Sequence, residues 1–193
     1  MAPNFRGSTG YGKDFEKKIF HDWGGGELKD FEYAAKWLLS QHWVDGKKLA
    51  VCGSSFGGFG TLSCLARLPQ YWKAGVDIFG PSNLITTVTT APAHWKVGDR
   101  ELIGDPEKEE EFLKERSPIT YIDNITADLL VIHGTNDPKV VKDESDQIVA
   151  RLRNMGRNVE YMIFDDEGHG FTKYPNMIKA NKVTAEFLAK RLS

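Results

Sequence analysis

The residues of this sequence that are best suited to chemistry stand directly after apolar runs. Residues 53–57 read Gly-Ser-Ser-Phe-Gly and match the pattern G-x-S-x-G, with Ser55 at its centre. A serine on such a turn, between a strand and a helix, has a strained backbone, and larger side chains at the two glycine positions would collide. The pattern predicts a nucleophilic Ser55 hydroxyl. It also directs the backbone N–H of Phe56, at a helix N-terminus, toward the place where an oxyanion forms.

Two other interpretations of this turn are a plain Gly/Ser-rich turn and a phosphate-binding loop. No Gly-Lys-Ser or Gly-Lys-Thr follows the strand, which argues against a P-loop. We expect Gly53 and Gly57 to relieve the collision across the turn. We expect Gly58 and Gly60 to let the following helix pack closely on the strand.

A serine nucleophile needs a base, and His169 is the best placed of the five histidines. It stands between Gly168 and Gly170, after the last apolar run and before the last helical segment, which suits an accessible loop. We expect His169 to take the proton of Ser55, and the alternative is a histidine on a surface loop. His133 ends an earlier apolar run and is expected to be structural.

The base in turn needs an acid, and Asp137 follows the apolar run 129–132 within the sequence G-T-N-D-P. The chain order Ser, Asp, His is the order of a hydrolase triad on an α/β sheet. Asp137 would fix the tautomer of His169 and stabilise its imidazolium. The alternative is a turn aspartate, since Asn-Asp-Pro also favours turns. Asp165 and Asp166 share the loop of His169 and are interpreted as a solvated turn.

Apolar patterning predicts the elements that must position these residues. Short apolar runs typical of buried strands lie at 49–52, 75–79, 129–132 and 159–164. Helical spacing is found at 31–39, 61–68, 141–155 and 177–192. This alternation predicts an α/β fold with a mostly parallel sheet flanked by helices, whose strand C-termini form one ligand-binding edge. The charge run 108–111 is expected to be an exposed helix face.

Composition limits the chain to one domain and excludes several classes of protein. With 193 residues, 40% hydrophobic and 27% charged, it is an ordinary globular chain. Its 25 basic against 27 acidic residues leave no basic excess for nucleic acid, and no apolar run is long enough to span a membrane. No signal peptide is visible, and Cys52 and Cys64 are expected to be buried thiols, so we predict a cytoplasmic, reducing location. Residues 165–167 with His169 lack a known ligand spacing, so we predict no metal and no cofactor.

Five segments in the same order also occur in a known family: 4–12, 53–58, 117–118, 133–138 and 166–171. On these segments the chain resembles the catalytic domain of the prolyl oligopeptidase family, in particular its acylaminoacyl-peptidase-like members. The resemblance implies one α/β-hydrolase domain over residues 1–193, with Ser55 as nucleophile, Asp137 as acid and His169 as base. It implies a serine peptidase that acts on short or N-blocked peptides and often on small acyl esters.

The chain departs from the family pattern at its front and beside the nucleophile. Phe56 stands where the family usually has tyrosine, and the chain opens where the family would be leaving its fourth strand. We therefore expect a hydrolase fold truncated on its N-terminal side, without the β-propeller and without the loop that resembles the source of a second oxyanion donor. Tyr11 is not an obvious replacement for that donor. The alternative function is a catalytically weak or inactive hydrolase fragment that acts only when paired with another chain.

Two further expectations concern the substrate and the assembly. Residues 81–95 follow the second strand, and we expect Trp95, with Phe56 as another wall, to form part of the acyl pocket; the alternative is a surface connection. The strand 49–52 has no partner on one side and carries no Lys or Pro to guard an edge. An open apolar edge predicts a homo-oligomer, most simply a two-fold dimer, unless residues 1–5 fold back as a covering strand.

Overall fold

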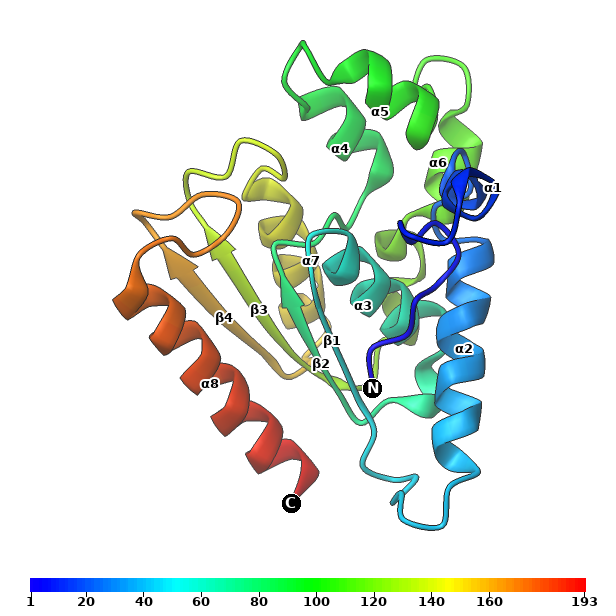
Figure 1. Ribbon diagram of the computed structural model, residues 1–193. Coiled ribbons are helices and arrows are strands. Elements are labelled where there is room, and N and C mark those ends of the chain that lie inside the picture. Colours follow the sequence, from blue (N-terminus) through cyan, green and yellow to red (C-terminus); the bar gives the residue numbers. More distant parts are fainter.

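A four-stranded parallel sheet forms the centre of the structure, a computed structural model that describes residues 1–193 (Figure 1). Its strands, in spatial order, are β1 (Ala50–Ser54), β2 (Ala74–Ile78), β3 (Asp128–Gly134) and β4 (Val159–Phe164). Each neighbouring pair is parallel, with Ala50 opposite Ala74 and Ala74 opposite Asp128. The predicted α/β fold with a parallel sheet is confirmed, and all four strands lie within two residues of the predicted runs.

Eight α-helices and three 3-10 segments surround the sheet. The helices are α1 (Lys13–Glu16), α2 (Gly26–Leu39), α3 (Phe56–Arg67), α4 (Leu84–Thr90), α5 (Lys96–Leu102), α6 (Glu110–Arg116), α7 (Asp143–Asn154) and α8 (Tyr174–Leu192). The 3-10 segments are η1 (Lys17–Ile19), η2 (Pro69–Tyr71) and η3 (Pro118–Asn124). The four predicted helices are confirmed as α2, α3, α7 and α8, although α2 and α3 each begin five residues earlier than predicted. No helix combines the length and the apolar character needed to cross a membrane.

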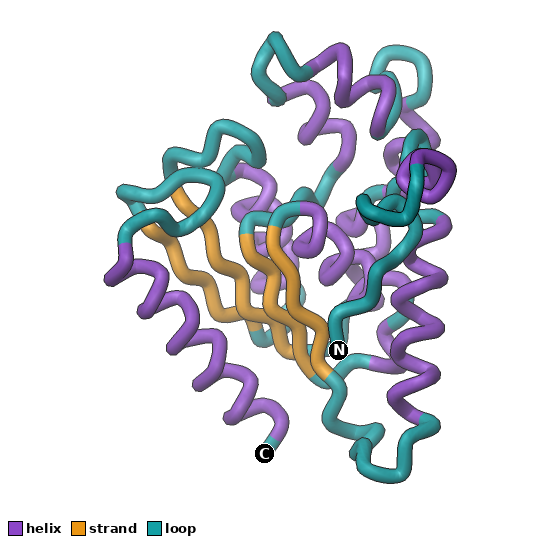
Figure 2. Tube along the Cα trace, viewed as in Figure 1, coloured by secondary structure: helices purple, strands orange, loops and turns teal.

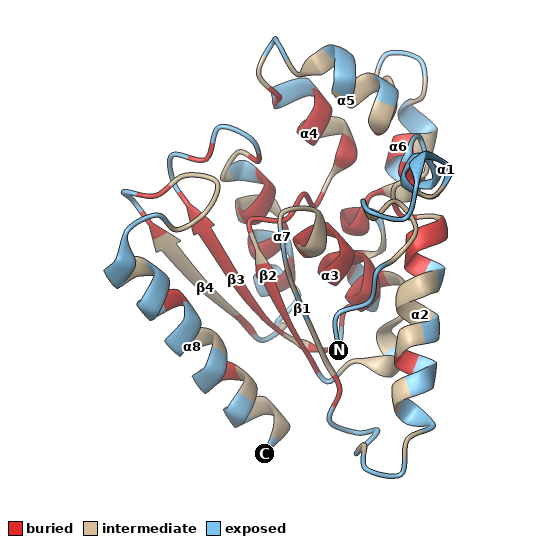
Figure 3. Cartoon of the chain, in the orientation of Figure 1, coloured by how far each residue is buried: buried red, intermediate tan, exposed pale blue.

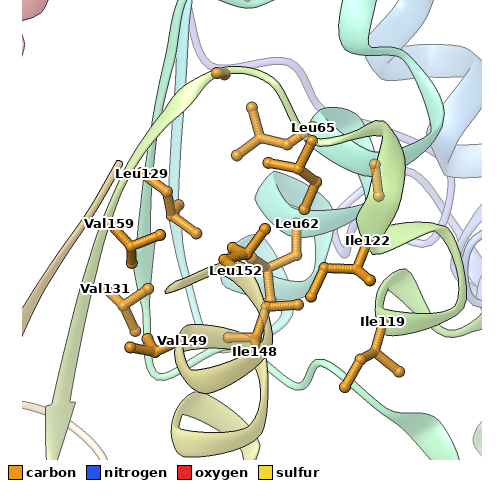
Figure 4. Close-up of a cluster of buried hydrophobic side chains, with 13 residues drawn as sticks. Leu62, Leu65, Ile119, Ile122, Leu129, Val131, Ile148, Val149, Leu152 and Val159 are labelled. Atoms are coloured by element: carbon orange, nitrogen blue, oxygen red, sulfur yellow. The ribbon is translucent and has the colours of Figure 1, made fainter. Parts of the chain in front are cut away.

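The two faces of the sheet are covered by different helices (Figure 1). Leu129 and Val131 of β3 face a cluster that includes Leu62 of α3 and Ile148 of α7, with η3 completing it (Figure 4). The alternate β3 residues face the second cluster, which α8 covers with Ala180 and Phe187. A strand with apolar side chains on both faces reads as a continuous apolar run, which is what residues 129–132 show in the sequence.

Three short helices, α4, α5 and α6, lie beyond the carboxyl ends of the strands (Figure 1). Neither α4 nor α5 was predicted from the sequence, and near α6 only the charge run was noted. Glu110 and Glu111 of that run are exposed on the first turn of α6, as predicted, but residues 108 and 109 precede the helix. A third apolar cluster holds this region, and it joins Phe59 of α3 to Leu84, Val88, Ile103 and Leu113.

The sheet is open along β1, which pairs with β2 and with no other strand of this chain. Residues 1–5 run as irregular chain between β1 and α2, so the alternative of a covering strand is wrong (Figure 2). The strands β2 and β3 are buried along most of their length, whereas β1 is not, so the expectation of a buried strand at 49–52 is wrong (Figure 3). The prediction that Cys52 and Cys64 are both buried thiols is wrong for Cys52 of β1, which is exposed, and is confirmed for Cys64 of α3. The physical reason is the missing neighbour: a strand at an open edge loses the cover that β2 and β3 share.

Candidate active site

Ser55 occupies a strained turn between β1 and α3. Its backbone has φ 56° and ψ −119°, a conformation that residues other than glycine rarely adopt. A Cβ on Gly53 would lie 2.2 Å from the carbonyl oxygen of Gly57, so the turn cannot close with a larger residue at position 53. A Cβ on Gly57 would meet nothing within 4 Å, so the expectation that both glycines relieve the collision holds for Gly53 alone.

The other two glycines of α3 allow close packing against different partners. A Cβ on Gly58 would lie 2.4 Å from an Asp77 carboxylate oxygen and 2.6 Å from the Gly80 Cα, which brings α3 down onto the end of β2 as predicted. A Cβ on Gly60 would instead lie 3.0 Å from the ring of Phe31 on α2. The expectation that Gly60 faces the strand is therefore wrong, because its side of α3 packs on another helix.

The structure brings Ser55, His169 and Asp137 together at the carboxyl edge of the sheet. The His169 Nε2 lies 2.8 Å from the Ser55 Oγ, and the His169 Nδ1 lies 2.7 Å from the Asp137 Oδ2. The other Asp137 oxygen accepts the backbone N–H groups of Lys139 and Val140 at 2.8 and 3.0 Å. With that oxygen engaged and its side chain fully buried, Asp137 presents a single oxygen to the imidazole.

His133 is buried behind the acid and makes two hydrogen bonds. Its Nε2 lies 2.8 Å from the Val140 carbonyl oxygen, and its Nδ1 lies 2.7 Å from the Ser145 Oγ. A carbonyl only accepts, so Nε2 carries the proton and the Ser145 hydroxyl donates to Nδ1. Burial lowers the pKa of His133, which favours this neutral form. The arrangement fits the structural role predicted for His133, because it holds the loop that carries Asp137.

A buried carboxylate that sequence analysis missed holds the loop of His169. Glu167 accepts the backbone N–H groups of Thr172 and Lys173 at 2.9 and 3.0 Å, and the Asn176 side chain donates to it at 2.9 Å. Desolvation raises the pKa of Glu167, but these hydrogen bonds outweigh it, and the net shift is downward. The available signal was an acid just ahead of a helix start, where free N–H groups attract carboxylates.

The neighbouring aspartates behave as the sequence suggested. Asp165 and Asp166 are exposed in a turn, and Asp166 forms an ion pair with Lys173. No three His, Cys, Asp or Glu side chains gather in the way that would hold a metal ion.

Phe79 follows β2 and supports the imidazole, a role that its place in the predicted run 75–79 does not indicate. Its ring centroid lies 4.7 Å from that of His169 and 5.7 Å from that of Phe171. Phe79 has φ 44°, an unfavourable conformation for an aromatic residue, and its N–H is held by the Ile132 carbonyl at 2.8 Å. Backbone strain of this kind persists where the surrounding structure fixes it and is common at functional sites.

The backbone N–H of Phe56 is the first of α3 and donates to no acceptor in the chain. This leaves it available at the mouth of the turn, where the sequence predicted an oxyanion donor. The Phe56 ring stacks on Phe5 and meets Trp23 edge-on at 4.6 Å. Tyr11 is exposed, and its hydroxyl accepts a hydrogen bond from Asn4, so it stands apart from this site.

A cavity of about 250 Å³ opens beside the Ser55 hydroxyl and the His169 ring. It is lined by both residues predicted to bind substrate, Phe56 and Trp95. Its other walls come from Trp23, Pro81, Thr87, Asp99, Leu102, Ile103, Lys139 and Val140. The sequence indicated the segment 81–95 but missed Trp23 and the α5 residues, whose helix is too short to show an apolar period.

Comparison with known proteins agrees with this geometry. A model of the prolyl oligopeptidase family matches residues 1–193. Dipeptidyl aminopeptidase BIII of Pseudoxanthomonas mexicana is 41% identical over 197 residues, which cover 100% of this chain and 29% of that protein. The chain thus spans less than a third of the length of this relative.

Solved structures give the same result. A puromycin-hydrolyzing peptidase of Mycobacterium tuberculosis superposes with a TM-score of 0.93 at 29% identity, over 98% of this chain and 29% of that one. The acylaminoacyl peptidase of Pyrococcus horikoshii superposes with a TM-score of 0.90 at 28% identity, over 98% and 32%. The parallel sheet with its flanking helices is an α/β-hydrolase fold, and the chain belongs to the prolyl oligopeptidase family.

Proposed function

We propose that this chain carries the catalytic machinery of a serine hydrolase that cleaves short peptides and small acyl esters through an acyl-enzyme. The observation that carries the proposal is the continuous hydrogen-bonded series Ser55–His169–Asp137 on a strained turn. Membership of a peptidase family supports the reaction class. The chemistry needs no cofactor, since nucleophile, base and acid are all side chains of this chain.

In the first half of the reaction, the Ser55 Oγ attacks the substrate carbonyl carbon while His169 Nε2 takes the hydroxyl proton. Asp137 holds the Nδ1 proton of His169 and stabilises the imidazolium. The carbonyl oxygen becomes an oxyanion that the Phe56 N–H can receive. The imidazolium then gives its Nε2 proton to the leaving amine or alcohol, and the acyl group stays on Ser55.

In the second half, water takes the place of the leaving group. His169 Nε2 removes a proton from the water as its oxygen attacks the acyl carbon, and it then returns that proton to the Ser55 Oγ. The acid product leaves with the enzyme restored. Loss of one oxyanion donor costs about 10²–10³ in kcat, so a site with the Phe56 donor alone is expected to be slowed and not abolished.

Labelling with a fluorophosphonate tests the proposal, because the probe reacts only with an activated serine. We expect the wild-type chain to be labelled and Ser55→Ala to be unlabelled. Ser54→Ala is the matched control, since Ser54 is exposed and precedes the turn, and it should label normally. A folded wild-type chain that takes no label would contradict the proposal and favour the alternative, a fragment that acts only when paired with another chain.

The location of this protein in the cell stays a prediction. Cys52 and Cys64 are both free thiols, which supports a reducing, cytoplasmic location.

A further inference from the structure

Asp77, near the end of β2, is a fully buried carboxyl group that the proposed reaction does not use. Its Oδ1 accepts the Gly80 N–H at 2.9 Å, while its Oδ2 has no hydrogen-bond partner in the chain. Burial raises the pKa of Asp77 to about 8, so the neutral acid prevails at pH 7. A buried polar group with an unpaired atom costs free energy, so its presence here points to a role other than stability.

The turn over residues 77–80, which this hydrogen bond closes, touches both Ser55 and His169. The carbonyl oxygen of Ile78 accepts the backbone N–H of Ser55 at 2.9 Å. The next residue, Phe79, has its ring centroid 4.7 Å from that of His169. Both contacts come from inside the ring that the carboxyl group closes. The turn therefore links the nucleophile to the base.

The Asp77 side chain also fills the space between this turn and the first turn of α3. A Cβ on Gly58 would lie 2.4 Å from the Asp77 Oδ1. A Cβ on Gly80 would lie 2.4 Å from the same oxygen and 2.6 Å from the Gly58 Cα. The two backbones thus meet at this carboxyl group, directly after the nucleophile turn. Phe79, with φ 44°, keeps its unfavourable conformation only where such neighbours fix it.

We propose that Asp77 is a positioning residue that sets the placement of Ser55 relative to His169 through the turn 77–80. The inference rests on the proposed function and adds a residue to it. Asp77 does not line the cavity, and it acts through the backbone and the ring that this turn supplies. Proton transfer needs the 2.8 Å contact between the Ser55 Oγ and the His169 Nε2, and a displacement of about 1 Å can cost about 100-fold in rate.

Two substitutions of Asp77 separate the hydrogen bond from the acid itself. Asp77→Asn keeps a carbonyl oxygen for the Gly80 N–H and matches the neutral form, so kcat for a p-nitrophenyl short-chain ester should stay within about 3-fold. Asp77→Ala removes the acceptor and opens space beside α3. We expect it to lower kcat by about 10- to 100-fold, with KM changed less than about 3-fold.

The kcat values are counted per fluorophosphonate-reactive molecule, so that unfolded protein does not enter the comparison. A merely structural role for Asp77 would lower the amount of reactive enzyme and leave kcat unchanged. An unchanged kcat in Asp77→Ala would therefore overturn the proposal. So would a loss in Asp77→Asn as large as that in Asp77→Ala.

Phe79→Leu tests the same link without disturbing the buried carboxyl group, and so covers the case in which Asp77→Ala does not fold. It removes the ring beside His169 and should lower kcat by about 10-fold. The double variant should lose less than the product of the two single losses, because both substitutions act through one turn. An unchanged kcat in Phe79→Leu, or losses that multiply, would overturn the proposal.

Glu27→Ala is the matched control for the loss of a buried carboxyl group. Glu27 is buried and accepts the backbone N–H of Gly24, in a turn ahead of α2. Its removal should lower Tm and leave kcat within about 2-fold. A fall in kcat as large as that of Asp77→Ala would show that any buried anchor has this effect, which would contradict a specific role for Asp77.

Proton NMR separates this proposal from the proposed function, because it needs no turnover. The His169 Nδ1 lies 2.7 Å from the Asp137 Oδ2, and a proton in so short a hydrogen bond should give a separate low-field signal, assigned by its absence from His169→Gln. We expect the signal in the wild type and in Asp77→Asn, and its loss or shift in Asp77→Ala. A wild type without the signal has no fixed imidazole and would overturn the proposal.

The two readouts together tell the two proposals apart. If no substrate is hydrolysed but the NMR signal responds to Asp77→Ala and not to Asp77→Asn, the hydrolase function fails and the positioning role stands. Normal hydrolysis by the wild type, with a signal and a kcat that Asp77→Ala leaves unchanged, would sink the positioning role alone.

Discussion

Two regions of the molecule are held in place by different means. One is the set of loops that carry Ser55, Asp137 and His169, and the other is the set of helices that line the cavity. We call the first region, the loops after β1, β3 and β4, the catalytic edge, and the second, α4 to α6, the helical wall. The loops that carry Asp137 and His169 are fixed in part by hydrogen bonds close to the functional side chain, as for Asp137 with Lys139 and Val140. The helical wall depends on residues far away in the sequence.

Glu144 of α7 is the main polar anchor of the helical wall. It is 1% exposed and accepts the backbone N–H groups of Ser82 and Asn83, both at 2.9 Å, just before α4 begins. Thr86 of α4 and Gln147 also donate to its carboxylate. The groups of the reaction therefore lie on the sheet edge, while the cavity wall depends on long-range contacts, chief among them Glu144 and the apolar cluster around Phe59.

The largest effect should come from breaking the catalytic edge. We expect Ser55→Ala and His169→Ala each to lower kcat/KM for a p-nitrophenyl short-chain ester by about 10⁴–10⁶, since the groups act as one unit. Asp137→Asn should cost about 10⁴, because the amide favours the wrong tautomer of His169. Asp165→Asn is the control in the same loop as His169 and should keep near-normal activity. Activity kept in Asp137→Asn but lost in Asp165→Asn or Asp166→Asn would mean that the acid is misassigned.

The same contrast explains what the sequence could and could not predict. The candidates Ser55, Asp137 and His169 each follow a strand that is apolar on its own, and parallel strands bring their ends to one edge, so short-range patterns were enough. The helices α4, α5 and α6 have seven residues each, too few for a clear period, and they are stable only through distant contacts. Phe79 was not predicted for the same reason, since its role depends on His169 and Phe171, which are far away in the sequence. Glu167 is different, because its partners are close in the sequence and its position ahead of a helix start was an available signal.

A smaller effect is expected from loosening the helical wall. Glu144→Ala would leave the Ser82 and Asn83 N–H groups without an acceptor, and we expect it to lower Tm by about 5–10 °C. It should raise KM for substrates that fill the cavity by about 10-fold while fluorophosphonate labelling of Ser55 changes little. Glu144→Gln keeps one carbonyl acceptor and should recover much of the loss. Equal losses of labelling and of binding in Glu144→Ala would show that the wall and the edge are not separable.

Trp95 tests whether the wall sets acyl preference. Because its ring lines the cavity beside Ser55, we expect Trp95→Ala to change the ratio of kcat/KM between large and small acyl esters by about 10-fold. Trp43→Ala, which removes a Trp that is 63% exposed, is the control and should leave the ratio unchanged. An equal loss on every ester in Trp95→Ala would count against a pocket role.

The buried carboxyl group of Asp77 lies beneath the catalytic edge and should make the stability of the fold depend on pH. Burial raises its pKa to about 8, with the nearby Glu144 charge adding to the rise, against an ordinary value of about 4. A raised carboxyl pKa contributes stability that is complete below pH 4 and is lost as pH rises through 8. We therefore expect Asp77→Asn to flatten the fall in Tm between pH 5 and 9 and to gain a few degrees at pH 8. An unchanged pH profile would show that the Asp77 carboxyl group is ionised in the fold.

The smallest effect on chemistry is expected at the open edge of β1, which lies beside the catalytic edge but contributes no group to it. We expect two copies of this chain to associate there, because β1 leaves one row of backbone groups unpaired. Sedimentation at micromolar concentration should give twice the chain mass of 21.7 kDa. Cys52→Lys places a charge on the exposed side of this strand and should yield a monomer, with ester hydrolysis changed less than about 2-fold, since edge lysines block strand pairing. A folded wild-type monomer would contradict association. A dimer that survives Cys52→Lys would place the contact elsewhere on the molecule.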